Sequence, residues 1–510
     1  MQSNKWLVAV TVMLPTLMVI IDTSVVNVSL DHIRGSLSAG IDEATWSITS
    51  YLAANAVMIP MTGWLSRYFG RKRYLHFSVG LFTLSSLLCG AAWNIESLVF
   101  FRIVQGIAGG SLQPISQSIL LETFPPIQHG TAMAIYGAGV MVGPVIGPLL
   151  GGWITDNWSW PWIFYINIPM GIIAIFMSMV FIKDPHYMQA LKVKVDYWGL
   201  AFLAVGIGCL QMVLDRGERY DWFASDAMVW MMIISAAALA LFVIIELFYA
   251  EHPIVDLRVF RSTSFTVGNV MMVIFFVNLF GSVVLLPLYL QTLMGYTATL
   301  AGFVLGPGAF ASIISMPLAG KLVNRMNPKI VLAAGIIATA YASYRMCLFD
   351  LHTDFVTVFW ARGLQGFTMS FVFIPLLTLT LSGIKKENMA NATSVFNSLR
   401  TLGGSFGVAF IATMLSRRAQ FHQSRLGEHF TSFDQVYSGT AEKLSGFLQG
   451  RGMDAFSSAK GSSAMIYDHL QKQAAMMAFS DIFFLLAFFL IVILPLVFFL
   501  VRIRHKAEAR

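Results

Sequence analysis

Charged residues are scarce in this sequence of 510 residues. Asp, Glu, Lys and Arg make up 12% of it, whereas hydrophobic residues make up 57%, and the mean hydropathy is +0.70. Soluble globular domains usually contain about 25% charged residues. This deficit excludes an ordinary soluble protein. The many apolar runs close to the ~20 residues that cross a bilayer indicate a polytopic membrane protein instead.

Cysteine and cofactor motifs are equally sparse. The three cysteines, Cys89, Cys209 and Cys347, fall within long apolar runs, so we expect no disulfide framework. The sequence contains no GxxxxGK(S/T) phosphate loop and no cluster of His, Cys and carboxylates with metal-ligand spacing. ATP-driven pumping and membrane metalloenzyme chemistry therefore lose their simplest support. We expect a protein with no metal, no cofactor and no enzymatic activity.

The apolar runs predict an all-α protein with fourteen membrane-spanning helices. Each run is long enough, or nearly long enough, to cross a bilayer as a helix. The expected spans are residues 6–30, 44–66, 75–95, 97–120, 131–152, 162–182, 197–215, 227–250, 266–290, 299–320, 330–349, 356–382, 389–415 and 477–501.

Basic residues are distributed unevenly between the two sets of connecting segments. With the first helix starting inside, one set carries Lys5, the clusters within 67–73, 183–194, 258–261, 321–329 and 385–386, and the C-terminal 502–510. The opposite short loops carry only Arg34, Arg216 and Arg219. This positive-inside bias predicts that both termini are cytoplasmic. It also explains the net charge of +7 without a nucleic-acid partner.

Two short patterns occur twice in the sequence. GWLSR at 63–67 is similar to GKLVNR at 320–325, and RIVQG at 102–106 is similar to RGLQG at 362–366. Both pairs share nearly the same offset of about 260 residues, which favours an internal duplication.

A duplication with this offset predicts two parallel six-helix halves separated by two inserted helices. We expect a first half at 1–183, two inserted helices with flanking loops at 184–262, and a second half at 263–510 that includes an outer loop at 416–476. Transporters built from such repeats handle substrate at the interface between the halves.

Several motifs together resemble a known family. The loop GWLSRYFGRKR (63–73), the RIVQG stretch (102–106) and GAGVMVGPVIGPLLGG (137–152) resemble three marker motifs of the major facilitator superfamily. Further matches are IDTSVVNVSL (21–30), WPWIFYINIPMG (160–171), LDRG (214–217) and HPIVDLRVF (252–260). The set is most similar to the fourteen-helix drug:H+ antiporter branch, and within it to EmrB-type exporters of the inner membrane.

This resemblance implies that the 63–73 loop is a cytoplasmic gating loop, with Gly63, Arg67, Gly70 and Arg71 as its key residues. The superfamily usually has aspartate followed by arginine where this chain has Arg67 and Tyr68. A conformational latch that depends on that aspartate is therefore not assumed here.

The 137–152 stretch combines a glycine stripe with two prolines. Gly139, Gly143, Gly147 and Gly151 recur every four residues, and such small-residue stripes let helices approach closely in lipid. Pro144 and Pro148 remove helical hydrogen bonds and can kink the helix. The stripe predicts either simple tight packing or, as the resemblance implies, a pliable seam at which the two halves rock.

Asp22 is the only carboxylate well inside any of the first six expected spans. A buried acid at that depth is costly and suggests a functional site. Burial disfavours its charged form and a nearby cation favours it, so such a group can exchange a proton. Arg102 is expected at a comparable depth, and the resemblance gives this arginine a role in proton coupling. The alternative is a permanent Asp22–Arg102 pair that only fixes helix packing.

Other polar residues within the expected spans are candidates for lining a substrate cavity. They are Asn27, Asn55, Gln113, Gln117, Asn278 and Arg400. Arg400 has no obvious acidic mate in the second half, and it could face an aqueous cavity, bind backbone carbonyls or meet Asp22. Abundant Phe and Met (41 and 28) suit a pocket for varied apolar ligands, although both are also ordinary lipid-facing residues.

Residues 416–476 form the longest polar segment, with ends that look like helical extensions of the adjoining spans and a Gly/Ser-rich middle. A loop this long is usually functional or disordered. The resemblance implies that it docks a periplasmic membrane-fusion adaptor (EmrA-like) and, through it, an outer-membrane channel (TolC-like). The alternative is a solvated linker without a partner.

The expected function is export of lipophilic or amphipathic drugs across the bacterial inner membrane, driven by the proton gradient through alternating access. One alternative is export of a narrow set, such as fatty acids or an endogenous metabolite, by the same mechanism. An alternative of another class is a non-transporting membrane receptor or scaffold. A passive channel is a further possibility, which predicts flux that no pH gradient reverses.

Overall fold

The computed structural model describes residues 4–183, 196–428 and 434–500, and every regular element in these ranges is a helix. The first half contains α1 (Lys5–Ser36), α2 (Ile41–Phe69), α3 (Arg71–Gly90), α4 (Ile95–Gly109), α5 (Leu112–Thr123), α6 (His129–Asn157), α7 (Trp162–Tyr165) and α8 (Asn167–Phe181). Two further long helices follow, α9 (Tyr197–Arg216) and α10 (Asp226–Ile244). The remainder contains α11 (Thr263–Thr292), α12 (Ala298–Arg325), α13 (Pro328–Cys347), α14 (Phe355–Leu381), α15 (Met389–Gly427), α16 (Gln435–Gln449) and α17 (Ala455–Val492).

The all-α fold expected from the sequence is confirmed. Within the described ranges, eleven helical segments are long and apolar enough to cross a membrane. Helices α2, α3 and α6 also coincide with expected spans but are not among these eleven, so the count of fourteen crossings stays a prediction.

One expected span, 97–120, is broken into α4 and α5 at Gly110 and Ser111. Pro114 explains the break, because proline lacks an N–H and its ring clashes with the carbonyl four residues earlier, here that of Gly110. Ser111 bridges the gap by bonding to the Ala108 carbonyl and to Ser78 of α3. The polar side chains of α5 are thereby set on a separate, short helix.

The two halves repeat one helix pairing. A Cβ atom at Gly106 would lie 2.5 Å from the carbonyl oxygen of Tyr51, and one at Gly366 would collide with the carbonyl of Gly308. Glycine at these positions therefore lets α4 approach α2, and α14 approach α12, to backbone contact. The repeated RxxQG motif thus places its glycine at an equivalent helix contact in each half. The domain boundaries themselves stay predictions.

The two halves are in backbone contact at the end of the bundle that holds Lys5, called here the Lys5 end. A Cβ atom at Gly63 of α2 would lie 2.7 Å from Cα of Asn391 on α15. Gly130 of α6 meets Gly320 of α12 in the same way, and the Gly130 N–H donates to Asn324 at 3.1 Å. The halves are therefore closed against one another at this end.

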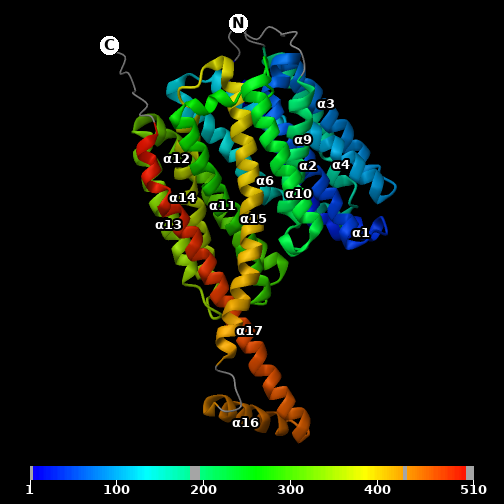
Figure 1. Cartoon of the computed structure of the whole chain (residues 1–510), viewed down its shortest axis with the longest axis vertical. Helices are drawn as coiled ribbons and strands as arrows, with labels where there is room; N and C mark the ends of the chain where they lie inside the picture. Colours follow the sequence, from blue (N-terminus) through cyan, green and yellow to red (C-terminus); the bar gives the residue numbers. More distant parts are fainter. Residues whose placement is uncertain (1–3, 184–195, 429–433, 501–510) are drawn as a thin grey trace.

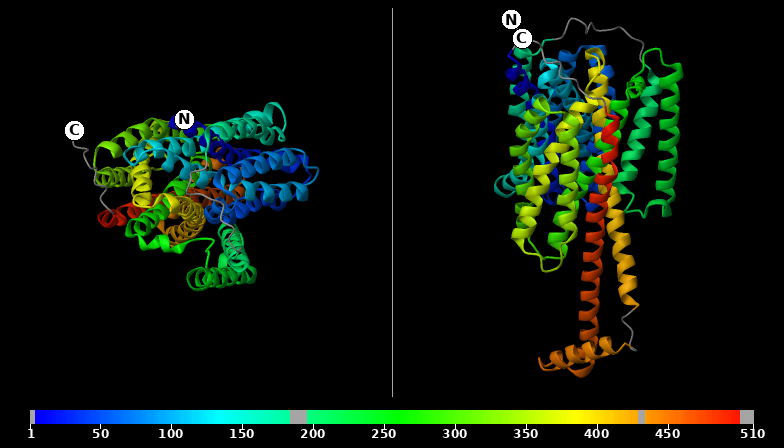
Figure 2. Two further views of the ribbon diagram at one scale, coloured as in Figure 1. Left: turned by 90° about the horizontal axis from the view of Figure 1, so that it is seen from above. Right: turned by 90° about the vertical axis from the view of Figure 1, so that its left-hand side faces the viewer.

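Helices α9 and α10 pack as a pair beside the main bundle (Figure 2). Gln211 of α9 donates to Ser405 of α15 at 2.8 Å, and Trp222 in the α9–α10 connection donates to Thr413 of α15 at 2.8 Å. Helix α9 also packs on α2. The pair therefore contacts both halves of the protein.

Helices α15 and α17 continue well beyond the bundle, and α16 lies across their far end (Figure 1). We call this projection, residues 416–428 and 434–476, the stalk. Asp481 joins its two long helices by contacting Arg418 at 2.5 Å and His422 at 2.7 Å. The expected helical extensions are present, and the Gly/Ser-rich middle is helical as well, on either side of a turn at 450–454.

Candidate functional site

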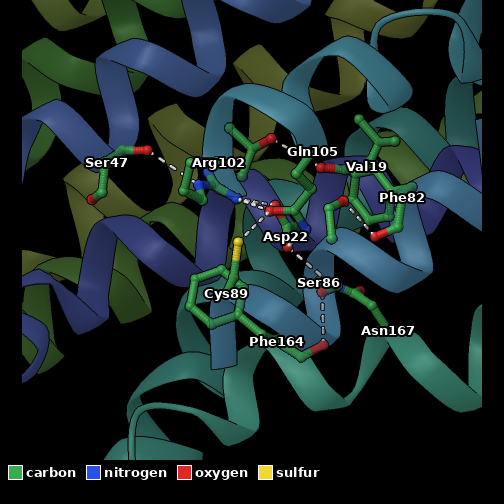
Figure 3. Close-up of polar contacts among 12 residues, drawn as sticks. Val19, Asp22, Ser47, Phe82, Ser86, Cys89, Arg102, Gln105, Phe164 and Asn167 are labelled. Carbon is green, nitrogen blue, oxygen red and sulfur yellow. Dashed lines mark hydrogen bonds and ion pairs between the residues drawn. The ribbon is translucent and has the colours of Figure 1, made fainter. Parts of the chain in front are cut away.

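Asp22 and Arg102 form an ion pair inside the first half. Nη1 of Arg102 on α4 lies 2.6 Å from Oδ2 of Asp22 on α1, and each residue is only 1% exposed. Their predicted proximity is therefore present in the structure (Figure 3). Charge-assisted bonds of this length are about twice as strong as neutral ones, so this pair is a major constraint on the distance between α1 and α4.

Two amide side chains complete the surroundings of the Asp22 carboxylate. Nε2 of Gln105 donates to Oδ1 at 2.9 Å, and Nδ2 of Asn167 donates to the same oxygen at 2.8 Å. Asn167 also donates to Ser86 on α3, which in turn donates to the Phe164 carbonyl. These donors stabilise the ionised carboxylate, since hydrogen bonds to a charged form favour it.

The guanidinium of Arg102 is held on three sides. Nη1 also donates to Oε1 of Gln105 at 2.7 Å, and Nε donates to the carbonyl of Ser47 at 3.1 Å. Its Cζ lies 4.0 Å from the centroid of the Tyr51 ring, a cation–π contact. Arg102 can therefore keep its place if the Asp22 carboxylate loses its charge.

The second half carries the same arginine and glutamine without the acid. Arg362 donates to Gln365, and Nε2 of Gln365 donates to Oγ of Ser282 at 3.0 Å and of Ser343 at 3.2 Å. Nε of Arg362 is buried and has no hydrogen-bond partner among the described residues. Within the described chain, the motif is thus paired with a carboxylate in the first half alone.

The glycine stripe of α6 faces α1 within the first half. A Cβ atom at Gly139, Gly143 or Gly147 would collide with the side chain of Met13, Ile20 or Ser24, respectively, and one at Gly151 would lie 3.0 Å from the Val25 carbonyl. The two halves instead meet along α6 at Gly130 and Gly137. The stripe is a close α1–α6 contact, and its location differs from the expected interface between the halves. Pro144 and Pro148 lie within α6, which is continuous from His129 to Asn157.

The predicted gating loop lies at the Lys5 end. Gly70 joins α2 to α3 with φ of +84°, a left-handed conformation that favours glycine. Arg71 forms a buried ion pair with Glu122 at the end of α5, at 2.6 Å. Arg67 interacts electrostatically with Asp256, which precedes α11. The backbone of Asp256 exchanges two hydrogen bonds of 3.0 Å with the side chain of Asn391.

Three of the expected cavity residues come together at the centre, where the two halves meet. Arg400 of α15 donates to Oε1 of Gln113 on α5 and, at 3.2 Å, to the Tyr136 hydroxyl on α6. That hydroxyl donates to Asn397, whose amide donates to Gln117. We call these five residues the central cluster. Among the described residues, Arg400 therefore meets neither Asp22 nor a backbone carbonyl, and its hydrogen-bond partners are neutral side chains of the first half.

The other expected cavity residues lie elsewhere. Asn27 is exposed on α1, and Asn55 lies where α2 meets Gly106 of α4 and the adjoining Gly110. Asn278 is buried within the second half and donates to the Leu486 carbonyl on α17 at 3.0 Å.

Glu246 is buried in the π-helical turn Ile245–Tyr249 that follows α10. Its Oε1 accepts from the backbone N–H of Ile254 at 3.0 Å and of Val255 at 3.4 Å. Glu246 thereby fixes the segment just before Asp256, and Asp256 is hydrogen-bonded to Asn391.

Sequence reasoning missed Gln105, Asn167, Tyr136 and Asn397. Gln105 could have been found, because it follows Arg102 by three residues and so shares its helix face. Asn167 lies in the quoted motif at 160–171 but on a different helix from Asp22. Tyr136 and Asn397 carried no signal, because nothing in the sequence pairs α6 with α15.

Comparison with known proteins identifies the family. The model of the Major Facilitator Superfamily matches residues 12–408. The chain belongs to this superfamily. It is 35% identical to the multidrug export protein EmrB of Escherichia coli K12, over 97% of this chain and 94% of EmrB. It is 37% identical to the fatty acid resistance protein FarB of Neisseria gonorrhoeae, over 95% of this chain and 94% of FarB.

Solved structures agree with this family fold. A double-tryptophan mutant of XylE superposes with a TM-score of 0.61 at 13% identity, covering 98% of this chain and 97% of that one. At this identity the likeness supports the fold alone. The protein is thus a multi-pass major facilitator transporter related to multidrug exporters.

Proposed function

We propose that this transporter exports lipophilic or amphipathic compounds across the inner membrane in exchange for protons. The observation that carries the proposal is the buried Asp22 carboxylate, which is bound by Arg102, Gln105 and Asn167. An intramembrane carboxylate that can gain a proton is the simplest carrier for a proton-driven cycle.

Proton binding at Asp22 changes the forces inside the first half. The neutral acid no longer attracts Arg102 as an ion, and the two amides lose a charged acceptor. Because Asp22 and Arg102 are sealed from solvent in this structure, proton exchange requires the first half to open around them. Proton transfer and helix movement are therefore coupled, as alternating access demands.

A packed route leads from Asp22 to the contact between the halves. Ile20 and Ser24, which flank Asp22 on α1, press against Gly143 and Gly147 of α6. Helix α6 in turn contacts α12 through Gly130 and Gly320 at the Lys5 end. Because glycine has no side chain, these contacts put little steric resistance in the way of α6 sliding along α1. This supports a role for the α1–α6 contact in the change between the inward-open and outward-open states.

The positive-inside bias supports a cytoplasmic Lys5 end and cytoplasmic termini. The stalk then projects into the periplasm, where it would dock a membrane-fusion adaptor and, through it, an outer-membrane channel. Replacing the stalk helices by a short linker is expected to abolish adaptor binding and leave proton-coupled exchange in liposomes intact. A receptor or scaffold would instead lose its function with the stalk and keep it in Asp22→Asn.

The decisive experiment uses purified protein in liposomes with an imposed pH gradient, a fluorescent lipophilic cation and an internal pH dye. The wild type is expected to move the cation uphill with counterflow of protons. Asp22→Asn should lose both fluxes and still bind the cation. Asp481→Asn is the matched control, because it removes a carboxylate at the base of the stalk. Coupled transport that survives in Asp22→Asn would overturn the assignment, and flux that no pH gradient can reverse would indicate a passive channel.

The same assay distinguishes broad from narrow export. FarB is a fatty acid resistance protein, so fatty acids belong in the ligand panel. Transport of fatty acids alone would favour a narrow exporter with the same mechanism.

A further inference from the structure

Arg400 is a buried cation at the interface between the halves. Its residue is 7% exposed, and its guanidinium contacts the neutral Gln113 and the Tyr136 hydroxyl. Its Cζ also lies 5.6 Å from the centroid of the Phe276 ring. No carboxylate of the described chain forms an ion pair with it. An arginine keeps its charge under physiological conditions, so this site holds a positive charge that the described residues do not neutralise.

The side-chain amide of Gln117, also in the central cluster, has a donor without an acceptor among the described residues. Oε1 of Gln117 accepts from Asn397, which fixes the orientation of the amide. Nε2 of the same side chain is buried without a hydrogen-bond partner in the part of the chain that the structure describes. Leaving such a donor unpaired is costly, and an unpaired buried charge costs more. A negatively charged acceptor at this site would both neutralise Arg400 and accept a hydrogen bond from the unpaired amide of Gln117.

The surroundings of the cluster on the second-half side are apolar. The Phe276 ring lies 6.0 Å from Phe373 between ring centroids. A Cβ atom at Gly137 would lie 3.1 Å from Phe373 and 3.2 Å from the sulfur of Met316. Helices α11, α14 and α12 of the second half thus supply Phe276, Phe373 and Met316 beside the central cluster, a composition that suits a hydrocarbon chain.

We propose that Arg400 and Gln117 form the headgroup site for an amphipathic carboxylate whose hydrocarbon chain lies against Phe276, Phe373 and Met316. The inference rests on the proposed export function and specifies a substrate class for its central site. A carboxylate binds arginine in a bidentate manner and offers a stronger acceptor than the Gln113 amide. Its arrival replaces the Gln113–Arg400 bond, which joins α5 of the first half to α15 of the second. Substrate binding thereby releases one link between the halves.

The test is equilibrium binding to the purified full-length protein in lipid nanodiscs, with radiolabelled laurate as probe. Unlabelled laurate, dodecanol and dodecyltrimethylammonium serve as competitors with equal chain length. The wild type is expected to bind laurate at least about tenfold more tightly than dodecanol, as a charged bidentate contact requires. Arg400→Gln should abolish this preference, and Arg400→Lys should retain part of it.

Two further variants separate recognition from folding. Gln117→Glu places a carboxylate in the central cluster that also holds Arg400, so the protein should fold and yet lose laurate binding while dodecanol binding persists. Arg362→Gln is the matched control, because Arg362 is also buried without an acidic partner among the described residues but lies within the second half. It should leave the laurate preference unchanged.

Equal affinities of the wild type for laurate and dodecanol, or a full preference in Arg400→Gln, would overturn the proposal. So would undiminished laurate binding in Gln117→Glu. The transport assay with the lipophilic cation reports on the proposed function separately. A headgroup preference without proton-coupled transport would support this site and refute the export mechanism. Proton-coupled transport without the headgroup preference would support the export mechanism and refute this site.

Discussion

Ser282 occupies in the second half the position that Asp22 occupies in the first. Gln105 donates to Asp22 at 2.9 Å and Gln365 donates to Ser282 at 3.0 Å, and each glutamine also accepts from the arginine three residues before it. One scaffold therefore appears twice, with an ionisable acceptor in one copy and a neutral acceptor in the other. Proton coupling through this scaffold would reside in the first half.

Removal of the Asn167 donor is expected to shift the pH dependence of exchange. Asn167→Ala deletes one hydrogen bond to the ionised carboxylate of Asp22, a bond of a kind worth about 1.5–3 kcal/mol. The Asp22 carboxylate is then held less firmly, so the pH profile of exchange should differ from that of the wild type. Asn278→Ala, which removes a buried amide of the second half, serves as the control. An unchanged pH profile in Asn167→Ala would contradict a proton-carrying role for Asp22.

A methyl group at Gly63 is expected to hold the halves apart at the Lys5 end. In Gly63→Ala the new Cβ would lie 2.7 Å from Cα of Asn391, and backbone atoms cannot turn aside. Closure can be followed by a disulfide between Thr131→Cys and Asn324→Cys, whose side chains are hydrogen-bonded at 2.8 Å, after replacement of the native cysteines by serine. Cross-linking should be slowed in Gly63→Ala and unaffected in Gly80→Ala, where the nearest atom is 4.0 Å away. Equal yields in both variants would show that the α2–α15 contact does not control closure.

Glu246 is expected to contribute to stability through its hydrogen bonds rather than its charge. Glu246→Ala leaves the buried N–H groups of Ile254 and Val255 without an acceptor, which should lower the free energy of unfolding by about 1–3 kcal/mol each. Glu246→Gln keeps an oxygen acceptor and should remain close to the wild type. Denaturant unfolding in detergent would measure both. A larger loss in Glu246→Gln than in Glu246→Ala would indicate that the charge itself is required.

The cap of α17 at the tip of the stalk is expected to weaken in acid. Hydrogen bonds from the side chain and N–H of Ser457 and from the N–H of Phe456 lower the pKa of Asp454 below its usual 3.8. Because the pKa is depressed in the folded state, the stabilisation is full above pH 3.8 and is lost as the pH falls through the folded value. A spin label at Lys460→Cys should therefore become more mobile at pH values well below 3.8.

In Asp454→Asn the cap keeps an oxygen acceptor but cannot titrate, so the mobility of the same label should stay constant over this pH range. Acid-induced mobility that persists in Asp454→Asn would assign the change to another group.

The sequence was sufficient to predict the all-α fold and the comparable depth of Asp22 and Arg102. The fold follows from apolar run lengths, which are a local property of the chain. The depths follow from counting residues from the ends of two spans, since the bilayer fixes depth. The partners of a side chain around the helix axis are harder to predict, because depth places a residue along its helix but does not identify its neighbours.

The glycine stripe and Arg400 illustrate that limit. Spacing alone correctly placed Gly139, Gly143, Gly147 and Gly151 on one face of α6, but the helix they contact is α1 of the same half. Arg400 was visible as a charge without a mate, yet its contacts with Gln113 and Tyr136 depend on how the two halves face one another. Such packing between distant helices has no counterpart in local sequence pattern.

Helix α15 begins at the contact with Gly63, passes Arg400 at the centre and ends within the stalk, as one continuous helix of 39 residues. At 1.5 Å per residue it is a rod of roughly 58 Å. A rod of this length acts as a lever: a tilt of a few degrees at the closed end becomes a displacement of several ångströms at its far tip. Under the proposed alternating access, the stalk would carry a mechanical readout of whether the transporter is open or shut, and a protein bound there would sense each turnover without touching the substrate.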